Sequence, residues 1–500
     1  MYTNDIDSTL SCNILTLDVS DHLATHTRIA LGSNSSTRTS CKNSTISKQN
    51  NVEQRMFNDA NHDKFKNLIN EENFGEITEE MDAQTAYNKF EEIYLKHYNE
   101  AYPLKRNRVR RKNERANPKP WILPWLEDAC ARKQNAYHEF VKTPTPENKA
   151  KYDNLNLFCE KHIEIAKTKY RKAYFEKHKN DSRKQWHMIN NLLGRNKKKL
   201  DLNKLTNSDG ATFSSPKAIA ECFNDYFSNI AGNLKLSSRP NQELSSNQDS
   251  YQKFLRDPVG RSIYLDKVSP SEVYKTIQSF KNKSTRDTKI EALKIANSSR
   301  IFTSSLASIV NKSFQEGLFP KQLKTAKVIP IHKEGSKSDV NNYRPISLLT
   351  SFSKVYEKLM YCRILKFLES NSSLFEMQYG FRPGRSCEHA LLNAQNCLLE
   401  SLSKRQVSLL LLIDFSKAFD MVEHSILLKK MEHYGIRGVT LKWMQSYLNN
   451  RKQYVSVNGS CSSVYNIKFG VPQGSILGPL LFLIYINDIP EVAKFAKSIL

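Results

Sequence analysis

A carboxylate at the end of an apolar run is the first candidate for chemistry in this sequence. Residues 406–414 read as a strand buried on both faces, and this run ends in Asp414. An α/β scaffold presents ligands at the ends of its strands, and a buried carboxylate needs a partner or a metal. Paired Mg²⁺ ions in phosphoryl transfer are held by such carboxylates. Taken alone, an Asp after a strand is more often a cap or turn residue, so the neighbouring segments decide its interpretation.

A loop rich in Gly and Pro stands before an apolar helix at residues 469–490. Pro472 and Gly474 allow close backbone approach, and the amide of Gln473, between them, can bond a base or a sugar. Taken without the other motifs, these three residues are better interpreted as a plain loop before a core helix.

Two further segments carry paired basic side chains. Lys333 and Arg344 stand around a polar turn, where they could grip a triphosphate. Arg382 and Arg385 lie on a Gly/Pro loop ahead of a predicted helix.

The elements that would position these residues alternate from residue 260 onward. Helical periodicity is predicted at 270–281, 303–316, 354–369, 388–402, 423–434 and 440–448. Strand-like runs are predicted at 326–332, 406–414 and 452–458. This alternation predicts an α+β or α/β body that contains the core.

The region before residue 260 is polar and basic. Residues 161–199 carry 13 Lys/Arg against three acids, with Tyr and Phe rings interleaved, and residues 101–120 carry eight Lys/Arg against Glu114. A generic basic run is usually a solvated helix face. Aromatic rings can stack on bases while cationic side chains contact phosphates, so we favour contact with nucleic acid as the interpretation of this region.

Composition limits the class of protein. The formal net charge of +24 favours a polyanionic partner, with nucleic acid first and an anionic membrane surface second. The longest apolar run, at residues 476–486, is too short to span a bilayer, and the first residues do not resemble a signal peptide. Nine cysteines without a CxxC pair fit reduced thiols. We therefore expect an intracellular protein of the nucleus or cytoplasm, without a membrane partner.

Four segments in order resemble the reverse transcriptase domain of non-LTR (LINE-type) retrotransposons of the Jockey-like kind: NNYRPISLL, QYGFRPGRS, LIDFSKAFD and GVPQGSILGP. The resemblance implies an α+β fold with the fingers of a right-hand polymerase at 260–404 and a partial palm at 405–500. It also implies RNA-directed DNA synthesis from dNTP substrates with Mg²⁺, on an RNA template and a DNA target or primer.

The same resemblance implies roles for single residues. Asp414 matches the catalytic, metal-binding carboxylate of the palm, and the backbone carbonyl of Phe415 would be a further metal ligand. Phe419 matches the ring beside the incoming sugar. Asp420 is expected to organise the palm locally rather than bind metal. The remaining matches are to nucleotide-binding residues (Lys333, Arg344, Gln473, Gly474) and to residues that face nucleic acid (Arg382, Arg385).

A second resemblance lies at the N-terminus. The segment LTLDVSDHLATHT is similar to the terminal strand of the endonuclease/exonuclease/phosphatase-like domain that precedes the polymerase in these elements, with Asp21 and His22 matching its hydrolytic pair. Residues 1–30 are therefore expected to be a C-terminal remnant of that domain. Residues 31–81 are expected to be a polar linker, and residues 82–259 a basic helical linker or N-terminal extension.

The sequence also departs from the family pattern. It ends at AKFAKSIL, where the family continues into a Tyr-Ala-Asp-Asp turn and a thumb, so we expect a fragment without a thumb and without activity of its own. A non-catalytic nucleic-acid-binding remnant is the alternative function. A group II intron maturase-like protein is more distant, because the endonuclease-like segment argues against it. The oligomeric state is left open.

Overall fold

A computed structural model of the chain describes residues 9–15, 24–29, 52–75, 77, 80–107, 120–179, 181–193, 202, 204–237, 250–280, 288–492 and 496–499. The chain divides into one unit of Met1–Val52 with Arg106–Arg111 and a second unit of Glu53–Lys105 with Lys112–Leu500. Among the described residues, no helix has both the length and the apolar character that a membrane span requires.

The first unit contains two paired strands, β1 (Thr9–Leu15) and β2 (Ala24–Ile29). They run antiparallel, with Leu15 opposite Ala24. Asp21 and His22, the two expected endonuclease-like residues, lie outside the described residues.

The second unit is built on one mixed sheet in the order β10-β9-β7-β8, with β11 also paired to β9. Strands β7 and β8 are antiparallel, with Pro330 opposite Pro345, whereas β7 and β9 are parallel. The strands predicted at 326–332 and 452–458 are confirmed. The bounds are β7 (Thr325–His332), β8 (Tyr343–Leu348), β9 (Arg451–Val457), β10 (Ser460–Cys461) and β11 (Tyr465–Ile467).

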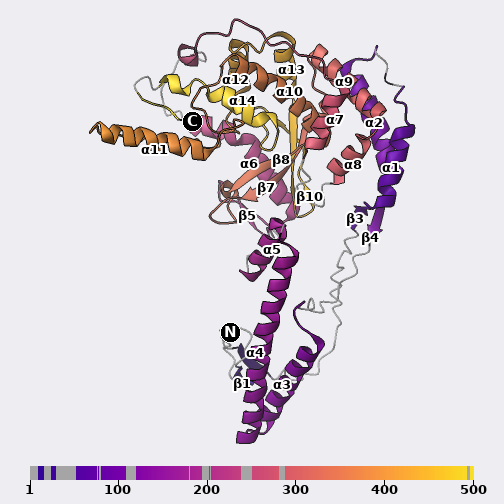
Figure 1. Cartoon of the computed structure of the whole chain (residues 1–500), viewed down its shortest axis with the longest axis vertical. Coiled ribbons are helices and arrows are strands. Elements are labelled where there is room, and N and C mark those ends of the chain that lie inside the picture. Colours follow the sequence, from indigo (N-terminus) through magenta and orange to yellow (C-terminus); the bar gives the residue numbers. More distant parts are fainter. Residues whose placement is uncertain are drawn as a thin grey trace. The chain divides into compact units, whose positions relative to one another are not determined.

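Helix α6 (Pro216–Ser237) packs on this sheet (Figure 1). Its Phe223 is fully buried and meets the Tyr343 ring of β8 edge-on at 4.9 Å. Val328 and Val455, from the two central strands, complete the same small core. The sheet is therefore covered by a helix from the region that was expected to be a linker.

A larger helical core surrounds the fully buried Trp443 and Tyr356. The six helices predicted from residue 260 onward are confirmed. The helix bounds are α7 (Pro270–Ser279), α8 (Thr288–Ala296), α9 (Arg300–Glu316), α10 (Ser351–Ser370), α11 (Cys387–Ser403), α12 (His424–His433), α13 (Gly438–Leu448) and α14 (Leu477–Ile486).

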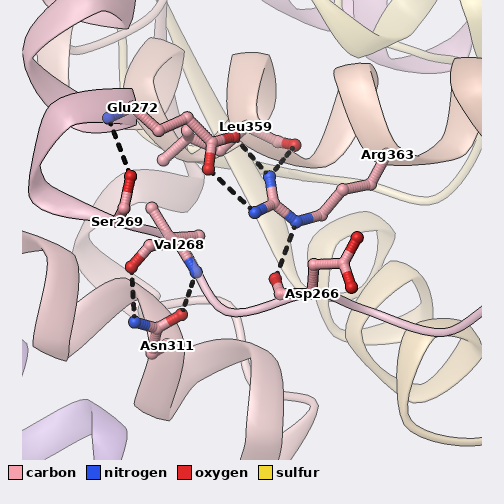
Figure 2. A network of polar contacts seen from close by, with 7 residues as sticks. All are labelled: Asp266, Val268, Ser269, Glu272, Asn311, Leu359 and Arg363. Carbon is pink, nitrogen blue, oxygen red and sulfur yellow. Dashed lines mark hydrogen bonds and ion pairs between the residues drawn. The ribbon is translucent and has the colours of Figure 1, made fainter.

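Polar contacts fix the segment before α7 to its neighbours (Figure 2). Arg363 of α10 forms a bidentate ion pair with Glu272 of α7, at 2.7 and 3.0 Å, and donates to the carbonyl oxygen of Asp266. Asn311 of α9 accepts from the Val268 N–H at 2.6 Å and donates to the Val268 carbonyl oxygen at 2.9 Å. Bidentate charge-assisted pairs are among the stronger polar contacts, so this network of contacts fixes α7, α9 and α10 to one another.

Two helices from the regions expected to be a polar linker (31–81) and a basic helical linker or N-terminal extension (82–259) pack into the larger core. They are α1 (Asp59–Glu71) and α2 (Ala83–Ala101). Phe90 of α2 meets the rings of Phe302 and Phe352 at 5.2 and 5.6 Å. Apolar residues spaced one turn apart give both helices a buried face, although their composition is polar overall.

The expected strand at 406–414 also needs correction. Residues 406–415 form neither a helix nor a strand, and their side chains are exposed, with Leu409 at 96%. A strand is stabilised by hydrogen bonds to a neighbouring strand. The sheet of the described residues ends at β8 on one side and β10 on the other, and neither edge pairs with this segment.

The basic helices α3 (Pro124–Lys142), α4 (Pro146–Lys177) and α5 (Ser182–Leu192) confirm the helical prediction for their region. Helices α3 and α4 pack against each other. Short elements complete the described chain: β3 (Val52–Arg55), β4 (Leu104–Asn107), β5 (Leu205–Thr206), β6 (Thr212–Phe213), and 3₁₀ turns at Ser250–Phe254, Lys321–Lys324, Val340–Asn342 and Ile489–Val492.

Candidate active site

The predicted Gly/Pro loop lies directly against the end of β8. The Gln473 carbonyl oxygen accepts a hydrogen bond from the Ser347 N–H at 2.7 Å. Gly474 has φ of 120°, and a Cβ at this position would lie 2.6 Å from the Ser347 carbonyl oxygen. A side chain is excluded here both by the contact and by the backbone conformation. The close backbone approach predicted from the sequence is therefore confirmed.

The Gln473 side chain is held by Asp420. Its Nε2 donates a hydrogen bond of 2.8 Å to Asp420 Oδ2. Burial raises the pKa of Asp420 to about 6, although the Gln473 hydrogen bond and the positive charge of Lys417 both act to lower it. This bond uses one of the two N–H donors of the amide, and it fixes the amide so that its oxygen can accept a hydrogen bond from a ligand.

Two backbone contacts join the loop to the segment that carries Phe419. The Val471 N–H donates to the Phe419 carbonyl oxygen at 2.9 Å, and the Gly470 N–H donates to the Val422 carbonyl oxygen at 2.7 Å. The Phe419 ring stacks on Phe482 of α14, with centroids 5.1 Å apart. The ring expected beside an incoming sugar thus lies next to the loop expected to contact the nucleotide.

Three cationic side chains lie near the Gly/Pro loop, and two of them, Lys333 and Arg344, were predicted from the sequence. Arg344 is exposed opposite Ile331 in the β7–β8 pair, and exposed Lys333, just after β7, has its Nζ 2.8 Å from Glu334. The third is Lys417. Burial lowers its pKa, Asp420 raises it, and the charges of Lys333 and Arg344 lower it further. The feature of the sequence that could have identified Lys417 is its position in the FSKAF segment, because the turn there places Lys417 beside Asp420.

Glu357 of α10 is a second residue that sequence reasoning missed. Its side chain is fully buried, and its Oε2 accepts a hydrogen bond of 2.7 Å from the Ile476 N–H, just before α14. Ser353 donates to its other oxygen at 2.8 Å. Burial raises the Glu357 pKa, and the charge of Arg451 opposes this shift. A carboxylate at a helix N-terminus stabilises that end of the helix, so Glu357 anchors the far side of the loop.

The two arginines of the second basic segment have local partners. Arg382 forms a bidentate ion pair with Glu369 of α10, at 2.8 and 2.6 Å. Arg385 donates to the Glu376 carbonyl oxygen and lies over the Tyr379 ring, 5.6 Å from its centroid. These contacts hold the loop before α11 in place, and the expected contact of both arginines with nucleic acid stays a prediction.

Asp414 and Phe415 are the expected metal-binding pair, and Phe415 lines a pocket together with Phe482, the ring on which Phe419 stacks. Both lie in the exposed segment after α11 that forms no strand. In the part of the chain that the structure describes, no group of three or more His, Cys, Asp or Glu side chains is placed to hold a metal ion. The structure therefore places the expected nucleotide-binding residues near Asp420, whereas among the described residues Asp414 belongs to no group of three or more such side chains.

Part of the chain matches a known protein family. Residues 331–497 match the family described as reverse transcriptase (RNA-dependent DNA polymerase). This range contains β7 from Ile331 onward, β8, the Gly/Pro loop and α14. Most of the site described above thus lies inside the matched range.

The chain is also similar to polymerases of mobile elements. The chain is 37% identical over 186 residues to the RNA-directed DNA polymerase from mobile element jockey of Drosophila melanogaster, and 35% identical over 192 residues to the probable RNA-directed DNA polymerase from transposon BS of the same organism. Each match covers 37% of this chain and 20% of the relative, so the chain matches about a fifth of their length. The expected resemblance to non-LTR retrotransposon reverse transcriptases is confirmed.

Proposed function

We propose that this domain serves RNA-directed DNA synthesis, adding dNTPs to a DNA primer on an RNA template. The observation that carries the proposal is the position of Gln473, which two hydrogen bonds hold beside Phe419 and near three cations. In this assignment residues 260–404 are the fingers of a right-hand polymerase and residues 405–500 are part of its palm.

The chain's own residues would bind and orient the nucleotide. Lys333, Arg344 and Lys417 would neutralise the triphosphate, since charge-assisted contacts to phosphate are strong. The Phe419 ring would lie against the sugar and exclude a 2′-hydroxyl. The Gln473 amide oxygen would accept a hydrogen bond from the nucleotide or the template. Correct orientation of a bound reactant lowers the barrier to reaction without further chemistry from the protein.

The family implies Mg²⁺, which when bound would neutralise charge that develops on the transferring phosphate. Asp414 and the Phe415 carbonyl would hold it. Mg²⁺ binds through one or two carboxylates together with substrate phosphates and water, so this pair fits one ion. Among the described residues no group of three or more His, Cys, Asp or Glu side chains could hold a metal ion, so substrate phosphates and water would complete the ligands of this ion.

Primer-dependent nucleotide binding tests the proposal. We expect the chain to dissociate more slowly from an RNA–DNA hybrid when the dNTP complementary to the next template base is present. Replacing Lys333 and Arg344 by Gln should abolish this effect, whereas Lys366→Gln, on the exposed face of α10, should leave it unchanged. Any primer extension should be lost in Asp414→Asn.

The alternative function is non-catalytic nucleic-acid binding. The basic helices α3 to α5 favour it, because they lie outside the reverse transcriptase domain. Binding of RNA that is insensitive to the complementary dNTP, with no primer extension, would support this alternative and contradict the polymerase proposal.

A further inference from the structure

Helices α3 and α4 form an antiparallel pair, and contacts along their length define how they face each other. Three of these contacts, in chain order along α3, are Trp125 with His162 (ring centroids 5.6 Å apart), Lys133 Nζ with Asn156 Oδ1 (2.8 Å), and Tyr137 with Tyr152 (ring centroids 5.3 Å apart). The residue numbers rise along α3 while those of the partners fall along α4. Figure 1 shows the two helices side by side.

This register places two cysteines opposite each other. Cys130 lies three residues before Lys133, and Cys159 lies three residues after Asn156, the partner of Lys133. Residues three apart on a helix are neighbours on the same face. Both thiols therefore lie where the two helices meet, about one turn from the hydrogen bond between Lys133 and Asn156.

The surroundings of Cys159 agree with this placement. Burial raises the pKa of the Cys159 thiol, its contact with the Cys130 thiol raises this pKa further, and the charge of Lys133 acts to lower it. The two thiols are thus in contact, and both are free.

The two thiols differ in their access to solvent. Cys159 is 1% exposed, whereas Cys130 is half-buried. An oxidant dissolved in water therefore reaches Cys130 first. Oxidised Cys130 would then lie against a second thiol that the oxidant itself does not reach.

We propose that Cys130 and Cys159 form a redox-sensitive pair, which hydrogen peroxide converts into a disulfide that joins α3 to α4. Disulfides of this reversible kind are typical of redox sensing in reducing compartments. The inference is independent of the proposed function, since both helices lie outside the range that matches the reverse transcriptase family.

The reaction has two steps and uses one molecule of hydrogen peroxide. The Cys130 thiolate attacks one peroxide oxygen, so an S–O bond forms, the O–O bond breaks, and the leaving hydroxide takes up a proton to become water. The Cys159 sulfur then attacks the sulfur of the Cys130 sulfenic acid. The S–S bond forms, the S–O bond breaks, and the second water leaves with the proton of the Cys159 thiol. Two thiols lose two electrons, and these reduce the peroxide to two water molecules.

Peptide mapping of the oxidised chain tests the proposal. The folded, reduced chain is treated with hydrogen peroxide, its remaining thiols are alkylated, and it is digested with trypsin without a reducing agent. Trypsin cuts after Lys and Arg except before Pro, so it releases Cys130 in residues 116–132 and Cys159 in residues 152–161. The disulfide links these two peptides, and the linked pair weighs two hydrogen atoms less than their sum.

We expect the linked pair to exceed any other disulfide of the chain about tenfold or more, because contact gives the two thiols a high effective concentration. Treatment with dithiothreitol should release both peptides. The matched control Cys461→Ser, which removes an exposed thiol, should give the same linked pair. Cys159→Ser should give none and should accumulate sulfenic acid at Cys130, which a dimedone probe detects.

Hydrogen exchange measures what the disulfide does to the two helices. The bond closes a loop of about 30 residues and should make separation of the helices rarer. We expect amide exchange that depends on this separation to slow by roughly a hundredfold after oxidation. Peroxide should leave exchange in Cys159→Ser unchanged.

Several results would overturn this proposal. One is overoxidation of Cys130 to the sulfinic acid without any linked pair, which would mean that Cys159 cannot reach it. Others are a linked pair that is no more abundant in the folded chain than in the chain denatured by urea, or one that is found only in covalent dimers. A linked pair without slower exchange in α3 and α4 would show that the disulfide does not hold the helices together.

Discussion

Replacing Asp420 by asparagine should stabilise the protein at neutral pH and remove one source of pH dependence. The Asp420 carboxyl is largely buried, and burial raises its pKa from the usual 3.8 to about 6. The folded protein therefore holds this proton more tightly than the unfolded chain does. The stability that the carboxyl contributes is fully present below pH 3.8 and is lost as the pH rises through about 6.

The size of this effect follows from the two pKa values. The interval from 3.8 to about 6, at about 1.36 kcal/mol for each pH unit, corresponds to about 3 kcal/mol. The asparagine side chain keeps an oxygen that can accept the hydrogen bond from Gln473, but it carries no charge to desolvate. The pKa of about 6 already includes the attraction of Lys417 for the carboxylate, so the expected gain at about pH 8 is about 3 kcal/mol.

Urea denaturation between about pH 4 and pH 8 measures this difference directly. The control variant is Asp257→Asn, which removes one carboxylate at an exposed position. We expect the free energy of unfolding of Asp420→Asn to be close to that of the wild type at about pH 4 and to exceed it increasingly up to about pH 8. A difference that does not change with pH, or one that favours the wild type more at higher pH, would refute the reasoning.

Three further predictions concern the loop and its neighbours. Gly474→Ala should destabilise the fold by about 1 to 3 kcal/mol in urea, because its Cβ meets backbone at a positive φ, whereas Gly384→Ala meets no atom within 4 Å. Equal losses in the two variants would show that only the backbone angle matters. Glu357→Leu should cost about 3 to 5 kcal/mol and speed hydrogen exchange of the Ile476 amide, with a smaller effect for Glu357→Gln, which keeps an acceptor. If hydrogen exchange of the Ile476 amide is unchanged in both Glu357 variants, the Glu357 carboxylate does not hold the turn into α14. Lys417→Gln should weaken the dNTP effect on the hybrid complex about tenfold, as expected for one charge-assisted contact, and an unchanged dNTP affinity would remove this cation from the site.

The Gly/Pro loop shows how far sequence reasoning reaches. A glycine close to a proline predicts close backbone approach, and the structure has this approach at Gly474. Its partner, Ser347, belongs to β8, far away in the sequence, and no local pattern identifies such a partner. The same holds for Glu357, because helical periodicity predicts a buried face for α10 but not which backbone N–H a buried carboxylate accepts from.

The segment at 406–414 shows the opposite case. Its run of apolar residues has the pattern of a strand buried on both faces, yet the structure leaves it exposed and unpaired with the sheet of the described residues. Periodicity reports which side chains would prefer burial, whereas a strand also requires a neighbour that supplies hydrogen bonds along its length. The burial of helices α1 and α2 was missed for a related reason, since a few apolar residues one turn apart suffice for burial when a core lies beside them.

The position of Gln473 depends on three segments that meet only in the folded protein. Ser347 holds its backbone, Asp420 holds its side chain, and Glu357 holds the turn into α14. Each contact satisfies a buried or partly buried polar group, and leaving such a group unpaired costs about 1 to 3 kcal/mol. A shift of the loop would break at least two contacts at once, at a cost of roughly 2 to 6 kcal/mol. The loop is therefore ordered before any nucleotide arrives, and binding energy need not be spent on ordering it.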